Sequence, residues 1–219
     1  MKRWENAQKA ISLLLTGTMV LTLCSCGKDK KAFEISKIAY DNTSMAYEAV
    51  EAMGSDIYEA WRLGIYEDDE MSVELLASEL SLSEDDIVKG VASFWIELGV
   101  VDSAEEVDVE LANSAFSAME DSLFSYCVRI VNEAYAANGT IEEVQGYLDE
   151  AKAKMKELSE DYSDYEHYPN LKGYYTTTNS FFDFCKNPSG SFEQVKTTIN
   201  DYKNEARDYS NDLDYIFED

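Results

Sequence analysis

Apolar residues recur along most of the chain with the spacing of an α-helix. Between Ile141 and Tyr165 they occur in alternating steps of three and four residues, and the segment from Phe192 to Ile216 repeats those steps. Seams of this kind are typical of long helices that cross at about 20° in bundles and coiled coils. No stretch sustains the period of two that a half-buried β-strand shows.

This periodicity predicts an all-α fold, an antiparallel helical bundle of about five long helices plus a short helical corner. The long helices are expected over residues 34–66, 104–137, 141–166, 170–186 and 191–217, and the corner over 72–80 and 84–98. Capping boxes at Ser103, Thr140 and Ser191 mark three of the helix starts. In the first helix we expect Ile38 and Met45 to be among the residues that face inward.

The N-terminal residues have the plan of a secretory signal. Three basic residues, Lys2, Arg3 and Lys9, precede an apolar run of 13 residues, Ile11–Leu23. As a helix this run measures about 20 Å, which is short for a hydrocarbon core of ~30 Å but is the length of a signal-peptide core. We therefore separate this segment from the folded body.

The sequence Leu23-Cys24-Ser25-Cys26 resembles the lipobox of bacterial lipoproteins. The resemblance implies transfer of a diacylglyceryl group to the Cys26 thiol, cleavage before Cys26, and anchoring by fatty acyl chains such as palmitate. Cys26 suits the modified position because Ser25 before it is small, whereas Cys24 follows the bulky Leu23. An ordinary secretory signal or an uncleaved membrane anchor is the alternative. The whole chain also resembles small helical lipoproteins of Gram-positive bacteria, a class to which no activity is assigned.

On this basis we divide the chain into a lipoprotein signal peptide (1–25), a polar tether (26–34) and a single helical-bundle domain (35–219). The full chain has 18 Lys+Arg and 44 Asp+Glu, a net charge of −26. Removing residues 1–25 deletes three bases and one acid, which leaves 15 minus 43, or −28. Such an excess of acid argues against a nucleic-acid partner, because phosphate contacts need Lys and Arg. An anionic membrane surface is expected to repel the body and to attract the lysines of the tether.

Two cysteines of the predicted body are candidates for a disulfide. Cys127 and Cys185 fall at about the same height if their helices are neighbours, and disulfides persist outside the cytoplasm. Equal height does not ensure that the two Cβ atoms face each other. The alternative is a pair of buried thiols that act as small hydrophobic residues.

Aromatic residues gather between residues 162 and 184. Tyr165, Tyr168, Tyr175 and Phe182 are candidates for a partner surface, because Tyr suits contacts that are half apolar and half wet. The alternative is that these rings pack in the core or at its rim.

Sequence motifs of catalysis are absent, including the nucleophile elbow, the zinc-protease motif and the phosphate-binding loop. We therefore expect no cofactor, no metal site and no enzymatic activity. The expected function is that of a lipid-anchored, extracytoplasmic lipoprotein that acts as a binding module at the cell envelope, with an envelope or phage protein as its partner. Two alternatives remain. One is a prophage-type superinfection-exclusion lipoprotein, and the other is a carboxylate-dependent hydrolase of envelope glycans, which would need a deep cleft with two carboxylates of raised pKa.

Overall fold

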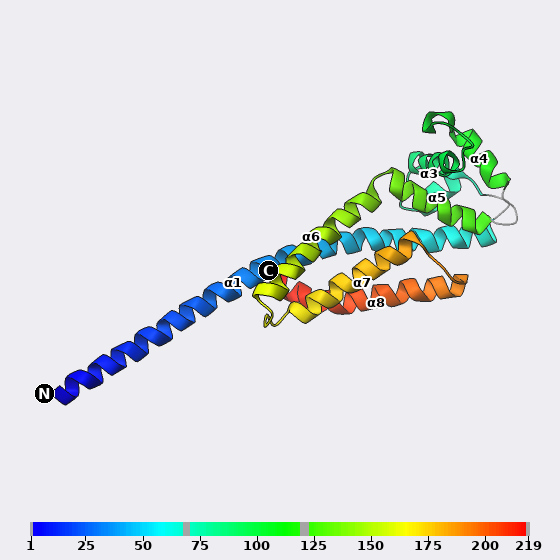
Figure 1. Ribbon diagram of the computed structural model, residues 1–219. Coiled ribbons are helices and arrows are strands. Elements are labelled where there is room, and N and C mark those ends of the chain that lie inside the picture. Colours follow the sequence, from blue (N-terminus) through cyan, green and yellow to red (C-terminus); the bar gives the residue numbers. More distant parts are fainter. Residues whose placement is uncertain (1, 68–70, 119–122, 218–219) are drawn as a thin grey trace.

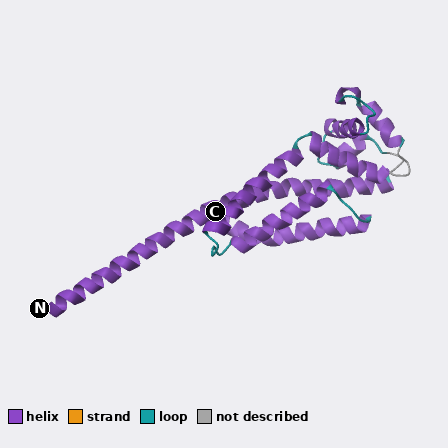
Figure 2. Cartoon of the chain, in the orientation of Figure 1, coloured by secondary structure: helices purple, strands orange, loops and turns teal. Residues whose placement is uncertain are grey.

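The computed structural model describes residues 2–67, 71–118 and 123–217, with side chains from residue 29 onward. Within these ranges the fold is all-helical and contains no β-strand, as the periodicity predicts (Figure 1, Figure 2). The elements are α1 (Lys2–Tyr66), α2 (Val73–Glu79), α3 (Glu84–Glu97), the 3-10 turn η2 (Ala104–Glu106), α4 (Val109–Ser117), α5 (Leu123–Ala137), α6 (Thr140–Asp161), α7 (Tyr168–Lys186) and α8 (Phe192–Phe217).

The longest helix, α1, is the axis of the molecule. Helices α5, α6, α7 and α8 all pack along it, and its first part projects beyond the bundle (Figure 1). The C-terminal end of α8 lies where α1 enters the bundle. There the rings of Phe33 and Phe217 are 5.4 Å apart, and Lys37 Nζ donates a hydrogen bond of 2.9 Å to the carbonyl oxygen of Phe217.

The helical seams of α6 and α8 are confirmed. In α6 the buried residues are Val144, Leu148, Ala151, Met155 and Leu158. In α8 they are Val195, Ile199, Ala206, Leu213 and Phe217. The α6 set keeps the three-and-four spacing, and the α8 set recurs at steps of four and seven with Tyr202 and Tyr209 half-buried between its members, because each helix presents a single apolar stripe to the bundle.

Residues 26–34, predicted to be a polar tether, are helical and continue α1. Ala32 is already buried against the bundle, and the hydroxyl of Ser36 donates to its carbonyl oxygen at 2.6 Å. Apart from Gly27, the residues from 26 to 34 are compatible with a helix. The folded body therefore begins a few residues earlier than predicted.

The inward face predicted for the first helix is also partly wrong. Ile38 and Met45 are exposed, whereas the neighbouring Ala39 and Ala46 are completely buried. Helices pack against α1 on several sides, and small side chains let them come close. Alanine positions therefore decide which face of α1 is covered.

The long helix predicted over residues 104–137 is divided into three elements. The capping box of Ser103 and Glu106 forms, but it starts only the turn η2. A second N-cap follows at once, where the carboxylate of Asp108 accepts a hydrogen bond of 2.8 Å from the N–H of Leu111 and starts α4. We call residues 71–118, which include α2, α3, η2 and α4, the head. The head rests on α5 at the end of the bundle farthest from the N-terminus (Figure 1).

Candidate functional site

The predicted lipidation residue, Cys26, belongs to α1, and its side chain lies outside the described residues. About 40 residues of continuous helix separate Cys26 from Tyr66, where α1 ends and the chain enters the head. At a rise of 1.5 Å per residue this distance is about 60 Å. Within the described part of the chain, no helix combines the length and the hydropathy of a membrane span.

Cys127 of α5 and Cys185 of α7 are free, buried thiols. The disulfide is therefore not formed, and the alternative of two buried thiols is confirmed. Both helices pack against α1 rather than along each other, and Cys185 Sγ lies 3.9 Å from the carbonyl oxygen of Val50 in α1. Burial raises the pKa of the Cys127 thiol to about 12 and also raises that of Cys185 well above its ordinary range, so both are poor nucleophiles.

The predicted aromatic partner surface is not assembled. Phe182 is 1% exposed and lies in the main core, so its assignment to a surface is wrong. Tyr165 and Tyr168 are half-buried against a second, smaller core near the start of α7, and Tyr175 is half-buried against the main core. Helix α7 is covered by α1, α6 and α8, which leaves little of its circumference for a partner.

The most heavily hydrogen-bonded carboxylate of the core is that of Asp56 in α1. Its Oδ2 accepts from the N–H of Ser81 at 2.9 Å and from the hydroxyl of Tyr135 at 2.6 Å, and its Oδ1 accepts from the hydroxyl of Ser81 at 3.2 Å. Burial raises the pKa of Asp56, and these hydrogen bonds oppose that rise. Asp56 thus joins α1 to the α2–α3 connection and to α5.

A cavity of about 330 Å³ lies beside Asp56. Its lining residues are Ser55, Asp56, Tyr58, Glu59, Glu79, Lys196, Ile199, Asn200 and Lys203. The charged groups in it are largely engaged, since Lys203 Nζ donates to Ser55 Oγ at 2.8 Å and Glu59 is paired with Arg62. Because both oxygens of Asp56 accept hydrogen bonds from the protein, this arrangement suits a structural carboxylate that holds helices together.

A smaller cavity of about 240 Å³ is bounded by the stacked rings of Trp61 and Phe124, whose centroids are 5.8 Å apart, and by Arg129 and Lys186. Both cations already have carboxylate partners. Arg129 is paired with Glu97 and Glu133, and Lys186 is 2.9 Å from Asp183. Among the described residues, no group of three or more His, Cys, Asp or Glu is placed to hold a metal ion.

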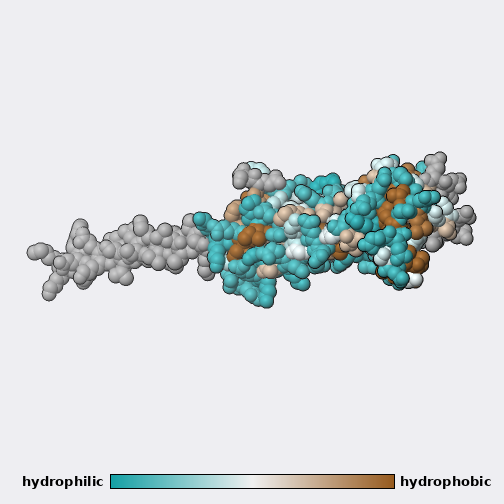
Figure 3. Space-filling model, turned by 90° about the horizontal axis from the view of Figure 1, so that it is seen from above, coloured by the Kyte–Doolittle hydropathy of each residue, from teal (hydrophilic) through white to brown (hydrophobic). Residues whose placement is uncertain are grey.

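Exposed apolar side chains gather instead on the head. Ile96, Leu98 and Val100 occur within five consecutive residues where α3 ends, and Leu98 and Val100 are 58% and 61% exposed. Leu111, in the first turn of α4, is exposed as well. Figure 3 shows apolar surface on the head within a largely hydrophilic surround. We call Ile96, Leu98 and Val100 the tip.

The sequence analysis missed the tip, although a signal for it was present. The segment Leu98-Gly99-Val100-Val101 follows the predicted end of a helix, and acidic residues follow it. Apolar residues just beyond the end of a helix do not belong to its apolar face, so the packing of that face does not bury them. Gly99, at a φ of 69°, turns the chain here in a conformation that favours glycine.

Comparison of the chain with known protein families, with curated proteins and with solved structures finds no match.

Proposed function

We propose that this chain is an extracytoplasmic lipoprotein, anchored by a diacylglyceryl group on Cys26, that acts as a binding module at the cell envelope. The observation that supports this proposal is the placement of the head along α1. The lipobox-like sequence occupies the part of α1 that projects from the bundle, and the head lies at the other end of the same helix, about 60 Å farther on. A rigid helix thus separates the anchor from the head.

The charge distribution fits this orientation. Lys28, Lys30 and Lys31 follow the anchor directly, where each gains about 1 kcal/mol from anionic headgroups. The remainder of the chain is strongly acidic and is repelled by the same surface. Since the screening length is about 8 Å at physiological salt, the head stands beyond the reach of the membrane charge.

A binding role suits the described side chains better than a catalytic one. Asp56, Cys127 and Cys185, whose pKa values are raised by burial, are committed to the interior. Leu98 and Val100 of the head are among the most exposed apolar side chains of the described residues. Surfaces of this kind are a common mark of contact with another protein.

The anchor is tested by labelling the full chain in a bacterial host with an alkyne-bearing palmitate. We expect the wild type and the matched control Cys24→Ser to take up the label and to sediment with membranes. We expect Cys26→Ser to take up none and to retain its N-terminal segment, because cleavage follows lipidation. A labelled Cys26→Ser variant, or a wild type without label, would overturn the proposal.

A further inference from the structure

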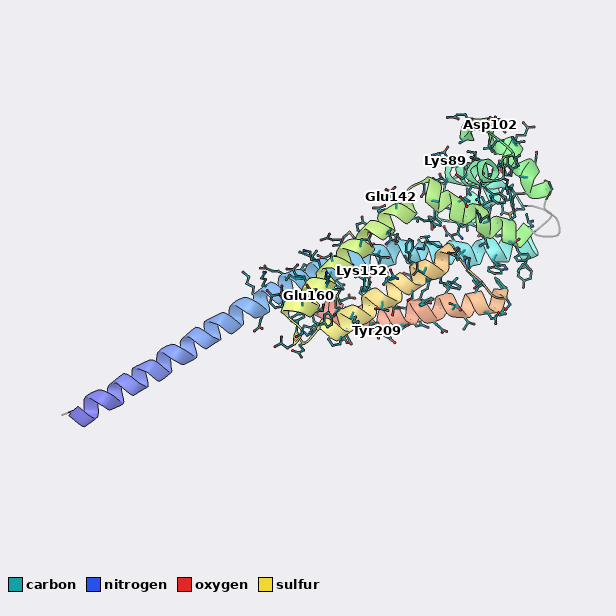
Figure 4. The ribbon with its side chains drawn as sticks, in the orientation of Figure 1. Lys89, Asp102, Glu142, Lys152, Glu160 and Tyr209 are labelled. Carbon is teal, nitrogen blue, oxygen red and sulfur yellow. The ribbon has the colours of Figure 1, made fainter. Side chains whose placement is uncertain are left out.

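Acidic residues are frequent in the sequence on both sides of the tip. Between Lys89 and Arg129 the sequence contains eight Asp or Glu and no Lys or Arg. Asp102, Glu105 and Glu110 are exposed on the head. Figure 4 shows Asp102 at the outer edge of the head and Lys89 nearer the bundle.

The base on each side of this stretch is already paired within the chain. Lys89 Nζ lies 2.5 Å from a carboxylate oxygen of Asp85, and Arg129 is paired with Glu97 and Glu133. Their charges are therefore balanced locally. The tip and its rim combine exposed aliphatic side chains with uncompensated negative charge.

The apolar side chains and the negative charge together narrow the classes of partner that can bind the tip. A second copy of the chain would bring a net charge of −26 against the same sign, and like charges placed together oppose association. Bacterial lipid surfaces are anionic as well, and the head lies at the end of α1 that is farther from the anchor. A basic protein surface with apolar side chains satisfies both the charge and the apolar area.

We infer that the tip is the docking surface for a basic, amphipathic helical segment of another protein. The apolar face of that segment covers Leu98 and Val100, and its Lys and Arg residues pair with Asp102, Glu105 and Glu110 at the rim. Helix docking on an apolar surface with basic flanks is a recurrent mode of peptide recognition. This inference names the partner class for the proposed binding module and rests on that function.

The test uses the full chain in nanodiscs of zwitterionic lipid and two synthetic helical peptides. One peptide carries Leu on one face and Lys on the other, and the second has the same charge with Ser in place of Leu. Binding is measured by fluorescence anisotropy, with empty nanodiscs subtracted. We expect the Leu peptide to bind the wild-type chain, and to bind it about tenfold more tightly than the Ser peptide does, because only the Leu peptide covers the tip.

Two matched double variants locate the contact. Leu98→Ser/Val100→Ser is expected to weaken binding of the Leu peptide about tenfold, whereas Ile38→Ser/Met45→Ser, which removes two exposed apolar groups from α1, leaves it unchanged. All four side chains are exposed, so circular dichroism should show that both double variants keep the wild-type helicity and unfolding temperature. Equal binding by the two variants would overturn the inference.

A second set of variants tests the acidic rim. Asp102→Asn/Glu110→Gln is expected to weaken binding about threefold at low salt and to reduce its salt dependence, whereas Glu142→Gln/Glu150→Gln on α6 is not. A Ser peptide that binds as tightly as the Leu peptide would show adsorption by charge alone and would overturn the inference. Self-association of the wild type that is lost in Leu98→Ser/Val100→Ser would assign the tip to a second copy instead. None of these results depends on the label at Cys26, so the docking surface and the anchor can fail separately.

Discussion

Replacing Gly90 with Ala probes how closely α3 packs on α5, the contact that seats the head. Gly90 is buried within α3, and a Cβ atom added there would lie 2.5 Å from the carbonyl oxygen of Ile130 and 2.9 Å from the backbone nitrogen of Ala134. Both neighbours are backbone atoms of α5. No side chain can rotate to make room, so the two helices must move apart.

Two opposing terms set the size of the effect. Ala is favoured over Gly by about 1 kcal/mol in a helix interior, and overpacking of a close-packed core costs about 1–3 kcal/mol or more. Because the added atom meets backbone, we place its cost at the upper end of that range. The expected net loss is about 1–2 kcal/mol, which lowers the unfolding temperature of a chain of this size by roughly 2–8 °C.

Gly146 provides the matched control. It is also inside a helix, α6, but it is exposed and an added Cβ has no neighbour within 4 Å. Gly146→Ala therefore gains the helix propensity alone, and we expect a rise of about 2–4 °C. Thermal and urea unfolding of both variants, followed by circular dichroism, distinguishes the two cases. If Gly90→Ala is as stable as the wild type or more so, α3 and α5 are not in the close contact described above.

Three further predictions concern buried groups. Burial raises the folded-state pKa of Asp56 above its ordinary 3.8, so the folded chain binds this proton more tightly than the unfolded chain does. The resulting contribution to the free energy of unfolding is fully present below pH 3.8 and is lost as the pH rises through the raised value. Urea titrations should therefore show the stability of the wild type falling relative to Asp56→Asn as the pH rises, and a difference that does not vary with pH contradicts this. Cys127 and Cys185 should resist a thiol reagent at pH 8 in the folded chain and should both react after unfolding without reductant, whereas an unfolded chain in which neither reacts would reveal a disulfide. Phe182→Ala should destabilise the fold by about 3–5 kcal/mol and Tyr215→Ala, at a side chain 91% exposed, by less than about 0.5 kcal/mol, and similar losses would place Phe182 outside the core.

The sequence was sufficient to predict the buried residues of a helix where a single apolar stripe packs against one neighbouring surface. The buried residues between Val144 and Leu158 in α6, and those between Val195 and Leu213 in α8, occupy predicted positions. It was insufficient for α1, because this helix is covered on several sides and Ala39 is buried in preference to Ile38. Hydrophobicity alone does not rank these residues, since the close approach of a neighbouring helix favours the smaller one.

The candidate site was harder to predict than the fold for the same physical reason. The sequence leaves open whether Tyr175 and Phe182 in α7 form a partner surface or pack in the core, and the covering of α7 by three helices, which no local pattern encodes, buries Phe182. In the head, Ser103 and Asp108 are both good N-cap residues, and only tertiary packing decides that each begins its own element.

The position of α1 at the centre of the bundle also governs the order in which the chain can fold. Lys37 meets Phe217 across 180 residues of sequence, and Tyr40 hydrogen-bonds to Asp214 across 174. These contacts join the first buried turns of the body to its last helix. A chain in synthesis therefore exposes this face of α1 until α8 has emerged, and closure of the smaller core waits for the C-terminus. Such long separations slow folding and lengthen the time during which apolar surface is open to other chains.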